Sequence, residues 1–346
     1  MKLVALGPSQ DAARVVDRVV HALGEQASGW EPRSVLGMRA QGAPDVVVPP
    51  RPRRHDSAGD ALAHALAVGV LAFLHADVAV RLDEPDAVHR LRVAARTLRS
   101  TLRTFGPLCD AAWADELRDR LHVAADALAA VRDTEVLYAR LEEHAERLDP
   151  TDRALVVPAL DNLLRPRLLE ARSAALDELR STRYLHLLVD LVDAAQHPRL
   201  AGRARREAAD VLPGLVADDW GALRRAVREL RHQRTDPQER AWHRSRILAK
   251  RARYAAQAAA PTLGRQARRW AEEMARLTDL LGELHDGVVA GQLLREAAAA
   301  PGVGGPTGFA LGRLLTVEST AVHDAATQFL RVWPQACRRL DRHGLG

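Results

Sequence analysis

The fold is decided by residues 88–99, VHRLRVAARTLR, because this stretch has a near copy later in the chain. The copy is WHRSRILAKRAR at residues 242–253, which repeats the histidine and the basic positions 154 residues further on. A second pair of segments follows downstream, LAAVRD at 128–133 and LGELHD at 281–286, and keeps the register to within one residue. Such self-similarity at a fixed offset predicts a tandem duplication of one structural unit.

Apolar residues recur with helical spacing nearly throughout the chain from Ser57 onward, and no convincing strand-like alternation interrupts them. We therefore predict an all-α fold in which each copy contributes a bundle of about four helices. The two copies are expected at residues 57–200 and 201–346. Their first three helices are predicted at 58–80, 85–105 and 112–131 in the first copy, and at 206–234, 237–260 and 265–284 in the second.

Capping and stop signals agree with these boundaries. Asp236 is suited to an N-cap, with Pro237 at the first helical position and Glu239 at the third. Gly106 and Pro107 are suited to ending the helix at 85–105. The residues expected to face the core of the second and third helices are Leu91, Ala95, Leu98, Leu102, Leu117, Leu121, Ala124 and Leu128.

Residues 1–56 differ from the rest of the chain. Residues 11–23 have helical spacing, and Gly, Pro and Ser then recur as far as a Pro- and Arg-rich stretch at 49–54, which we expect to be an extended linker. No signal-peptide pattern is visible, and the most apolar stretch, residues 65–74, is too short to span a bilayer. We therefore expect a soluble, cytoplasmic protein without a membrane partner.

The composition favours an anionic partner but does not identify it. The chain has a formal net charge of +5 and a pI near 9.8, and 48 of its 50 basic residues are arginine. Abundant arginine and alanine can reflect GC-rich coding alone, so the placement of the arginines is the informative feature. Cys109 and Cys337 are too few for a disulfide framework or a zinc cluster, and they fit a reducing compartment.

The helix at 85–105 carries a stripe of cations that we call the first cationic row. Its members lie within roughly 80° of arc on an ideal helix, beside the apolar stripe and not opposite to it. No acidic residue interrupts the sequence between Arg90 and Arg103, although like charges at this spacing destabilise a helix. The first cationic row consists of His89, Arg92, Arg96, Arg99 and Arg103.

The second copy keeps the same pattern as a second cationic row, which consists of His243, Arg246, Lys250 and Arg253. A single charged stripe is usually a solvated helix face, but its retention in both copies favours binding of a polyanion that relieves the repulsion. Guanidinium groups grip phosphate oxygens in bidentate fashion and stay charged near neutral pH. Three further arginines precede this row at helical spacing and could extend the same wall: Arg224, Arg228 and Arg231.

The histidines and aspartates of the repeated blocks are interpreted as binding or structural groups. His89 and His243 are expected to face phosphate, and no HExxH motif or paired cysteine accompanies them, so no metal site is predicted. Structural hydrogen bonding is the alternative reading for both histidines. Asp133 and Asp286 are expected to hold neighbouring arginines or helix ends in place and to have no catalytic role.

The four blocks resemble the family of conserved histidine α-helical domains, abbreviated CHAD. The resemblance covers roughly residues 57–340 and departs at Ser245, where an apolar residue is more usual. It implies two four-helix bundles related by pseudo-two-fold symmetry around a central basic groove, inorganic polyphosphate as ligand and association with polyphosphate granules. Carried over by position, it implies binding by His89, Arg92, Arg96, Arg99, His243, Arg246, Lys250 and Arg253.

CHAD domains often follow a triphosphate-tunnel domain, and residues 1–45 could be the remnant of one. The acidic ExExK strand motif of that domain is absent, so we predict no triphosphatase activity. A non-enzymatic polyphosphate-binding protein without a cofactor, expected to be a monomer, is the preferred reading.

Two alternatives to this reading stay open. A nucleic-acid binder could use the same arginines, although recognised DNA-binding motifs are lacking and stacking aromatics are few. A polyphosphate-converting enzyme would need a carboxylate cluster or a Walker-type glycine loop, and the glycines at 302–305 do not make such a loop.

Overall fold

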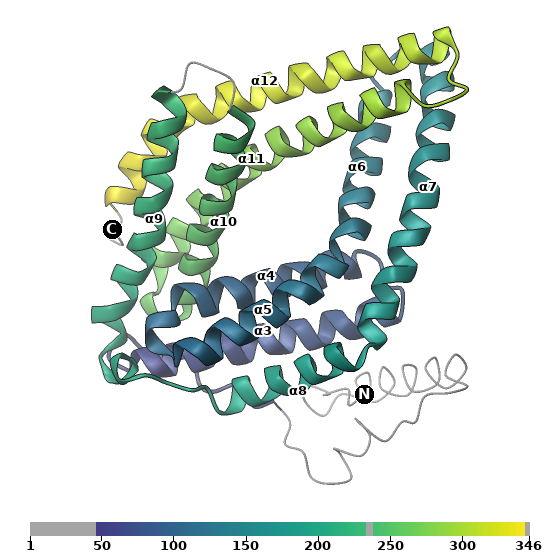
Figure 1. Cartoon of the computed structure of the whole chain (residues 1–346). Helices are drawn as coiled ribbons and strands as arrows, with labels where there is room; N and C mark the ends of the chain where they lie inside the picture. Colours follow the sequence, from purple (N-terminus) through teal and green to yellow (C-terminus); the bar gives the residue numbers. More distant parts are fainter. Residues whose placement is uncertain (1–45, 233–237, 343–346) are drawn as a thin grey trace. The chain divides into compact units, whose positions relative to one another are not determined.

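The computed structural model describes residues 46–232 and 238–342, and this part of the chain is all-α. It contains ten α-helices, α3 to α12, with two short 3-10 helices and two isolated β-bridges, and no strand is formed between these residues (Figure 1). The predicted fold class is therefore confirmed. The predicted helix at 11–23 and the N-cap at Asp236 and Pro237 lie outside the described residues.

The described residues group into two compact units, each assembled from separate segments. Unit 1 contains residues 46–52, 59–127 and 176–205, and unit 2 contains 53–58, 128–175 and 206–342. This grouping differs from the contiguous copies 57–200 and 201–346, because residues 128–175 group with the second copy. The tandem division and its pseudo-two-fold symmetry stay predictions from the repeat.

Unit 1 is built on α3 (Ala58–Arg81), α4 (Ala87–Thr104), α5 (Ala111–Ala127) and α8 (Thr182–Gln196). α4 packs on α5, and α5 packs on α8. All eight residues predicted to face the core in the second and third helices are buried. α4 ends at Thr104, immediately before Gly106 and Pro107 begin a 3-10 turn, as the stop signal predicts.

α3 contains the apolar stretch 65–74, and its apolar character extends beyond that stretch in both directions. It is the one helix of the described residues that is long and apolar enough to cross a membrane, but 61% of its apolar window is buried inside the fold. It also carries a buried ion pair: Arg81 Nε donates to Asp77 at 2.9 Å, and the Tyr184 hydroxyl donates to the same carboxylate at 2.8 Å. α3 is therefore the interior helix of unit 1.

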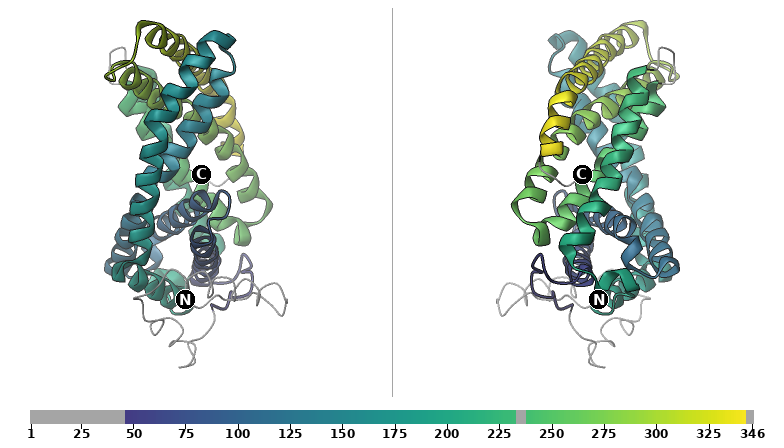
Figure 2. Two further views of the ribbon diagram at one scale, coloured as in Figure 1. Left: turned by 90° about the vertical axis from the view of Figure 1, so that its right-hand side faces the viewer. Right: turned by 90° about the vertical axis from the view of Figure 1, so that its left-hand side faces the viewer.

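Unit 2 contains α6 (Ala129–Ala145), α9 (Ala208–His232), α10 (Gln238–Leu263), α11 (Arg265–Ala298) and α12 (Gly305–Arg342). α10 packs between α9 and α11, and α11 packs along α12. Figure 2 shows α12 from two further sides as one helix that reaches the C-terminal end of the described chain. α7 (Pro150–Arg180) supplies Val156, Leu160 and Leu164 to an apolar core shared with α6, α11 and α12.

The third helices of the two copies differ. In the first copy α5 stops at Ala127, a turn follows at Leu128, and α6 begins at Ala129, so the helix predicted at 112–131 is two helices. In the second copy α11 passes the matching position, Leu281, without a break and ends at Ala298, well beyond the predicted 284. Both leucines are buried, so the hydrophobic pattern that sequence periodicity detects is the same in the two cases.

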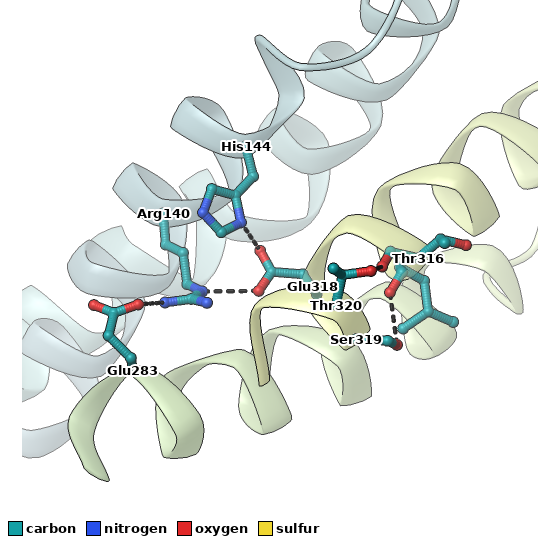
Figure 3. A network of polar contacts seen from close by, with 8 residues as sticks. Arg140, His144, Glu283, Thr316, Glu318, Ser319 and Thr320 are labelled. Carbon is teal, nitrogen blue, oxygen red and sulfur yellow. Dashed lines mark hydrogen bonds and ion pairs between the residues drawn. The ribbon is translucent and has the colours of Figure 1, made fainter. Parts of the chain in front are cut away.

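A buried polar network links three helices of unit 2 (Figure 3). Glu318 of α12 is 1% exposed and accepts hydrogen bonds from Arg140 Nε at 2.8 Å and from His144 Nδ1 at 2.7 Å. Arg140 also donates to Glu283 of α11 at 2.8 Å. Burial lowers the pKa of Arg140, but its hydrogen bonds to Glu283 and Glu318 raise it overall. The network fixes α6 against α11 and α12.

Candidate functional site

The first cationic row lies along α4, within unit 1. His89, Arg92, Arg96 and Arg99 are half-buried and Arg103 is exposed, as expected for a stripe that borders the apolar face of the helix. The buried stripe beside it includes Leu91, Leu98 and Leu102, which hold α4 in the core. The row is thus presented by a helix whose adjoining apolar face is held in the core.

Three arginines of the first row have no ion-pair partner among the described residues. Within the described part of the chain, no carboxylate lies within ion-pair distance of Arg96, Arg99 or Arg103. Burial lowers the pKa of Arg99, and the neighbouring Arg118 and Arg96 lower it further, against the opposing effect of Asp126. Burial is therefore the main cause of the lowered pKa of Arg99, and the repulsion from Arg96 within the row is a smaller contribution.

The second cationic row lies along α10, within unit 2. His243 is exposed, and Arg246, Lys250 and Arg253 are half-buried. Two of them approach carboxylates of α11 at long range: Arg246 lies 3.6 Å from Asp286, and Arg253 lies 3.8 Å from the exposed Asp279. The second row is therefore partly neutralised, and this contact agrees with the structural role predicted for Asp286.

Arg253 is fixed more firmly than its distance to Asp279 suggests. One of its terminal nitrogens donates to the Thr278 hydroxyl at 3.1 Å, and that hydroxyl in turn donates to the backbone carbonyl of Ala275. Its Nε is buried and has no hydrogen-bond partner among the described residues. Arg253 is therefore held against α11 through Thr278.

His285 is a residue of this region that the repeated sequence pattern did not indicate. Its ring centroid lies 5.4 Å from that of His243. Burial lowers the pKa of His285 to about 4, assisted by the positive charges of Arg246, His243 and Lys250. Burial also raises the pKa of the adjacent Asp286, against the effect of Arg246 and Lys250. The repeat could not reveal His285, because Arg132 stands at the matching position of the first copy.

The three additional arginines, Arg224, Arg228 and Arg231, are exposed on α9. They line a cavity of about 440 Å³ together with Trp333 and Cys337 of α12. Arg224 also lies 3.2 Å from Asp341 and stacks over the Trp220 ring at 5.8 Å. These arginines therefore lie beside residues of α12. Their spacing in the sequence had suggested that they extend the second cationic row.

Ser245, the departure from the family pattern, is accommodated without cost to hydrogen bonding. It is fully buried, and its hydroxyl donates to the carbonyl of Ala241 at 2.9 Å. The described residues contain no group of three or more His, Cys, Asp or Glu side chains arranged to hold a metal ion.

Comparison with known proteins now identifies the family. The family profile described as CHAD domain matches residues 64–295. The chain belongs to the CHAD domain family. The uncharacterized protein Rv2226 of Mycobacterium tuberculosis is 33% identical over 273 residues, which cover 77% of this chain and 50% of that protein. The chain thus spans about half the length of the curated relatives it matches.

Two solved structures of this type are similar to the chain. PptA from Streptomyces chartreusis has a TM-score of 0.70 at 26% identity, covering 81% of this chain and 100% of PptA. The CHAD domain from the plant Ricinus communis has a TM-score of 0.61 at 25% identity, covering 81% of this chain and 94% of that domain. These similarities agree with the all-α fold described above.

Proposed function

We propose that this CHAD protein binds inorganic polyphosphate through the two cationic rows on α4 and α10. The observation that carries the proposal is the state of the first row: neither the half-buried Arg96 and Arg99 nor the exposed Arg103 has a carboxylate of the described residues in ion-pair reach. Such an arrangement costs stability in the free protein and is relieved by a bound polyanion. The family resemblance supports polyphosphate as that polyanion.

The geometry of a helical row suits a linear chain of phosphates. Residues three and four apart on a helix present their side chains about 5–6 Å from one another along one face. Each guanidinium can form two parallel hydrogen bonds to the oxygens of one phosphate, and these charge-assisted bonds are stronger than neutral ones. A polyphosphate chain lying along α4 or α10 would therefore meet successive cations. A central groove shared by both rows belongs to this proposal.

We propose a binding protein and not an enzyme. Hydrolysis or transfer of phosphoryl groups needs a metal held by carboxylates or a comparable set of electrostatic groups. Purified protein incubated with polyphosphate and Mg²⁺ should leave the length of the polyphosphate unchanged, as followed by gel electrophoresis. Progressive shortening would overturn the non-catalytic part of the proposal.

A competition experiment tests the choice of ligand. Labelled long-chain polyphosphate is bound to the protein and challenged with single-stranded or duplex DNA at equal phosphate concentration and equal salt. We expect polyphosphate to remain bound, because its negative charges are more closely spaced than those along one strand of DNA and few aromatics offer stacking for bases. Displacement by DNA at equal phosphate concentration would favour the nucleic-acid binder instead.

The proposed cellular setting is the cytoplasm, at polyphosphate granules. This follows from the ligand, since a protein that binds long polyphosphate concentrates where that polymer accumulates. Wild-type protein should co-sediment with granules, and a variant with neutralised rows should stay in the supernatant. Co-sedimentation of both would show that the rows do not direct localisation.

A further inference from the structure

Unit 2 contains a cavity that shares only His243 with the cationic rows. It has a volume of about 640 Å³ and lies between α9, α10 and α11. Its floor is apolar, formed by Ile247, Leu248, Leu281, Leu284, Val288 and Val289. Its rim contains four cations, Arg225, Arg240, Arg244 and Arg251. His243 and His285 also line it, and His285 is neutral near pH 7 because its pKa is lowered to about 4.

Apart from the shared His243, the cavity and the second cationic row use neighbouring faces of α10. Arg244, Ile247 and Arg251 of α10 line it, whereas Arg246, Lys250 and Arg253 do not. Ile247 remains 38% exposed, so part of the apolar floor is open to solvent. Arg244 is paired with Glu229 at 3.0 Å, but both side chains are more than half exposed. A pair of this kind contributes little and can be exchanged for a stronger anion.

Several residues that line this cavity in the second copy are replaced in the first copy. The sequence register matches Arg240 to Asp86, Arg251 to Thr97 and Val288 to Glu135. The first copy therefore replaces two rim arginines with an acid and a neutral residue, and one floor valine with a carboxylate. The cationic rows are kept at the same register in both copies. Neither the shared helical fold nor the rows account for the chemistry of the cavity.

The ligand must satisfy both parts of the cavity. Inorganic polyphosphate would use the arginines but would leave the apolar floor in contact with water. A simple apolar molecule would cover the floor but would form no charge-assisted hydrogen bond with the guanidinium groups of the rim. The volume lies within the range of about 300–1,000 Å³ that is usual for small-molecule sites. Arginine side chains can bind phosphate and can also stack on planar aromatic rings.

We propose that this cavity binds a nucleoside triphosphate, with the base on the apolar floor and the phosphates at the arginine rim. This site lies beyond the proposed polyphosphate function and does not depend on it. ATP and GTP are suitable probes, and inorganic tripolyphosphate is the matched anion without an apolar body. Binding of each is measured by isothermal titration calorimetry on the full chain at fixed salt.

Two variants reproduce the first copy at single positions: Arg240→Asp and Val288→Glu. Arg240 is exposed and Val288 is only half-buried, and the matching residues Asp86 and Glu135 are tolerated in the first copy, so both variants are expected to fold. Arg268→Asp is the matched control, since Arg268 is an exposed arginine of α11 that lines neither cavity nor row. Unchanged far-ultraviolet circular dichroism and melting temperature establish folding in each case.

We expect saturable nucleotide binding that is at least tenfold tighter than tripolyphosphate binding. Val288→Glu and Arg240→Asp should each weaken nucleotide binding at least tenfold, while Arg268→Asp leaves it within twofold of wild type. Equal affinities for ATP and tripolyphosphate, or equal reductions in all three variants, would overturn the inference. A wild-type protein that binds nucleotide but not long-chain polyphosphate would instead refute only the proposed function.

Discussion

At the scale of single residues, Arg99 shows the conflict between stability and binding most clearly. Its side chain is half-buried, and both burial and the charges of Arg118 and Arg96 lower its pKa. A cation in this position weakens the free protein unless an anion joins it. The spacing of the arginines predicts repulsion within the row. The effects of burial and of Arg118 of α5 on the pKa of Arg99 could be seen only in the structure.

Substitution Arg99→Gln should separate stability from binding. Because the charge is repelled and partly desolvated, the melting temperature of the free protein should stay the same or rise. Affinity for polyphosphate should fall about tenfold, which corresponds to about 1.4 kcal/mol. Differential scanning fluorimetry and a filter-binding titration measure the two effects. A large decrease in thermal stability with unchanged affinity would show that Arg99 is a structural residue.

His285 should make polyphosphate binding depend on pH. Its pKa is lowered to about 4, so it is neutral near pH 7 in the free protein. A bound polyanion would raise this pKa, so binding should take up a proton, and affinity should increase as the pH falls from about 7 to 5. In the variant His285→Gln this increase should be smaller. Titrations from about pH 8 to 5 test it, and identical pH profiles for both proteins would contradict it.

The same shift has an opposite consequence for the free protein. Because the folded pKa of His285 lies below the ordinary value of 6.5, the unfolded chain binds more protons between about pH 6.5 and 4. The stability that neutral His285 preserves at pH 7 is lost as the pH falls through that window. His285→Gln should therefore be less sensitive to acid than wild type, as measured by urea denaturation at about pH 7 and about pH 5.

At the scale of helices, periodicity predicted most elements of the described chain. The helices expected at 58–80 and 85–105 are observed as α3 (58–81) and α4 (87–104), since their apolar stripes pack into a core. Periodicity could not predict the break at Leu128, because Leu128 and Leu281 are both buried and differ only in the backbone at that point. The long α11 and the joining of residues 128–175 to unit 2 were missed for the same reason.

The network around Glu318 should be the strongest polar contribution to unit 2. Removing the carboxylate with Glu318→Ala leaves the buried His144 without this acceptor and leaves Arg140 with Glu283 alone. Breaking a buried, hydrogen-bonded ion pair from one side typically costs about 3–5 kcal/mol. We expect the free energy of unfolding to fall by about 3 kcal/mol, as measured by urea denaturation. A decrease below about 1 kcal/mol would show that water or neighbouring groups replace the carboxylate.

A matched exposed pair provides the control for that experiment. Arg244 and Glu229 form an ion pair at 3.0 Å on the surface of unit 2. Glu229→Ala should change the free energy of unfolding by less than about 1 kcal/mol, because exposed pairs contribute little. A difference between the two variants therefore reports burial of the network and not the mere presence of an ion pair.

At the scale of the whole molecule, the sequence was enough to identify the family and the cationic rows but not the composition of the units. The repeat keeps its register from His89 to Asp133, so both rows could be found by aligning the two halves of the chain. The cavity that joins Arg224, Arg228 and Arg231 to α12 brings together residues more than a hundred positions apart, and one-dimensional spacing contains no information on them. The cavity beside α10 was missed because its floor and rim come from three helices.

The dependence of binding on salt and on each row tests the central claim most directly. Long-chain polyphosphate is titrated against wild type, a first-row variant (Arg92, Arg96 and Arg99 to Gln), a second-row variant (Arg246, Lys250 and Arg253 to Gln) and a control. The control changes Arg265, Arg268 and Arg269 to Gln, three exposed arginines of α11 outside the rows. Each titration is repeated at several salt concentrations, with helicity checked by circular dichroism.

Each phosphate that a variant no longer binds should reduce the slope of log affinity against log salt by a little less than one for a polyanion of this charge density. We predict that either row variant weakens binding at least a hundredfold and flattens the slope, while the control keeps both within error of wild type. Combined reversal to glutamate at Arg92, Arg96 and Arg246 should abolish binding with helicity intact. If the row variants and the control weaken binding equally, net charge and not the two rows binds polyphosphate, and the account is wrong.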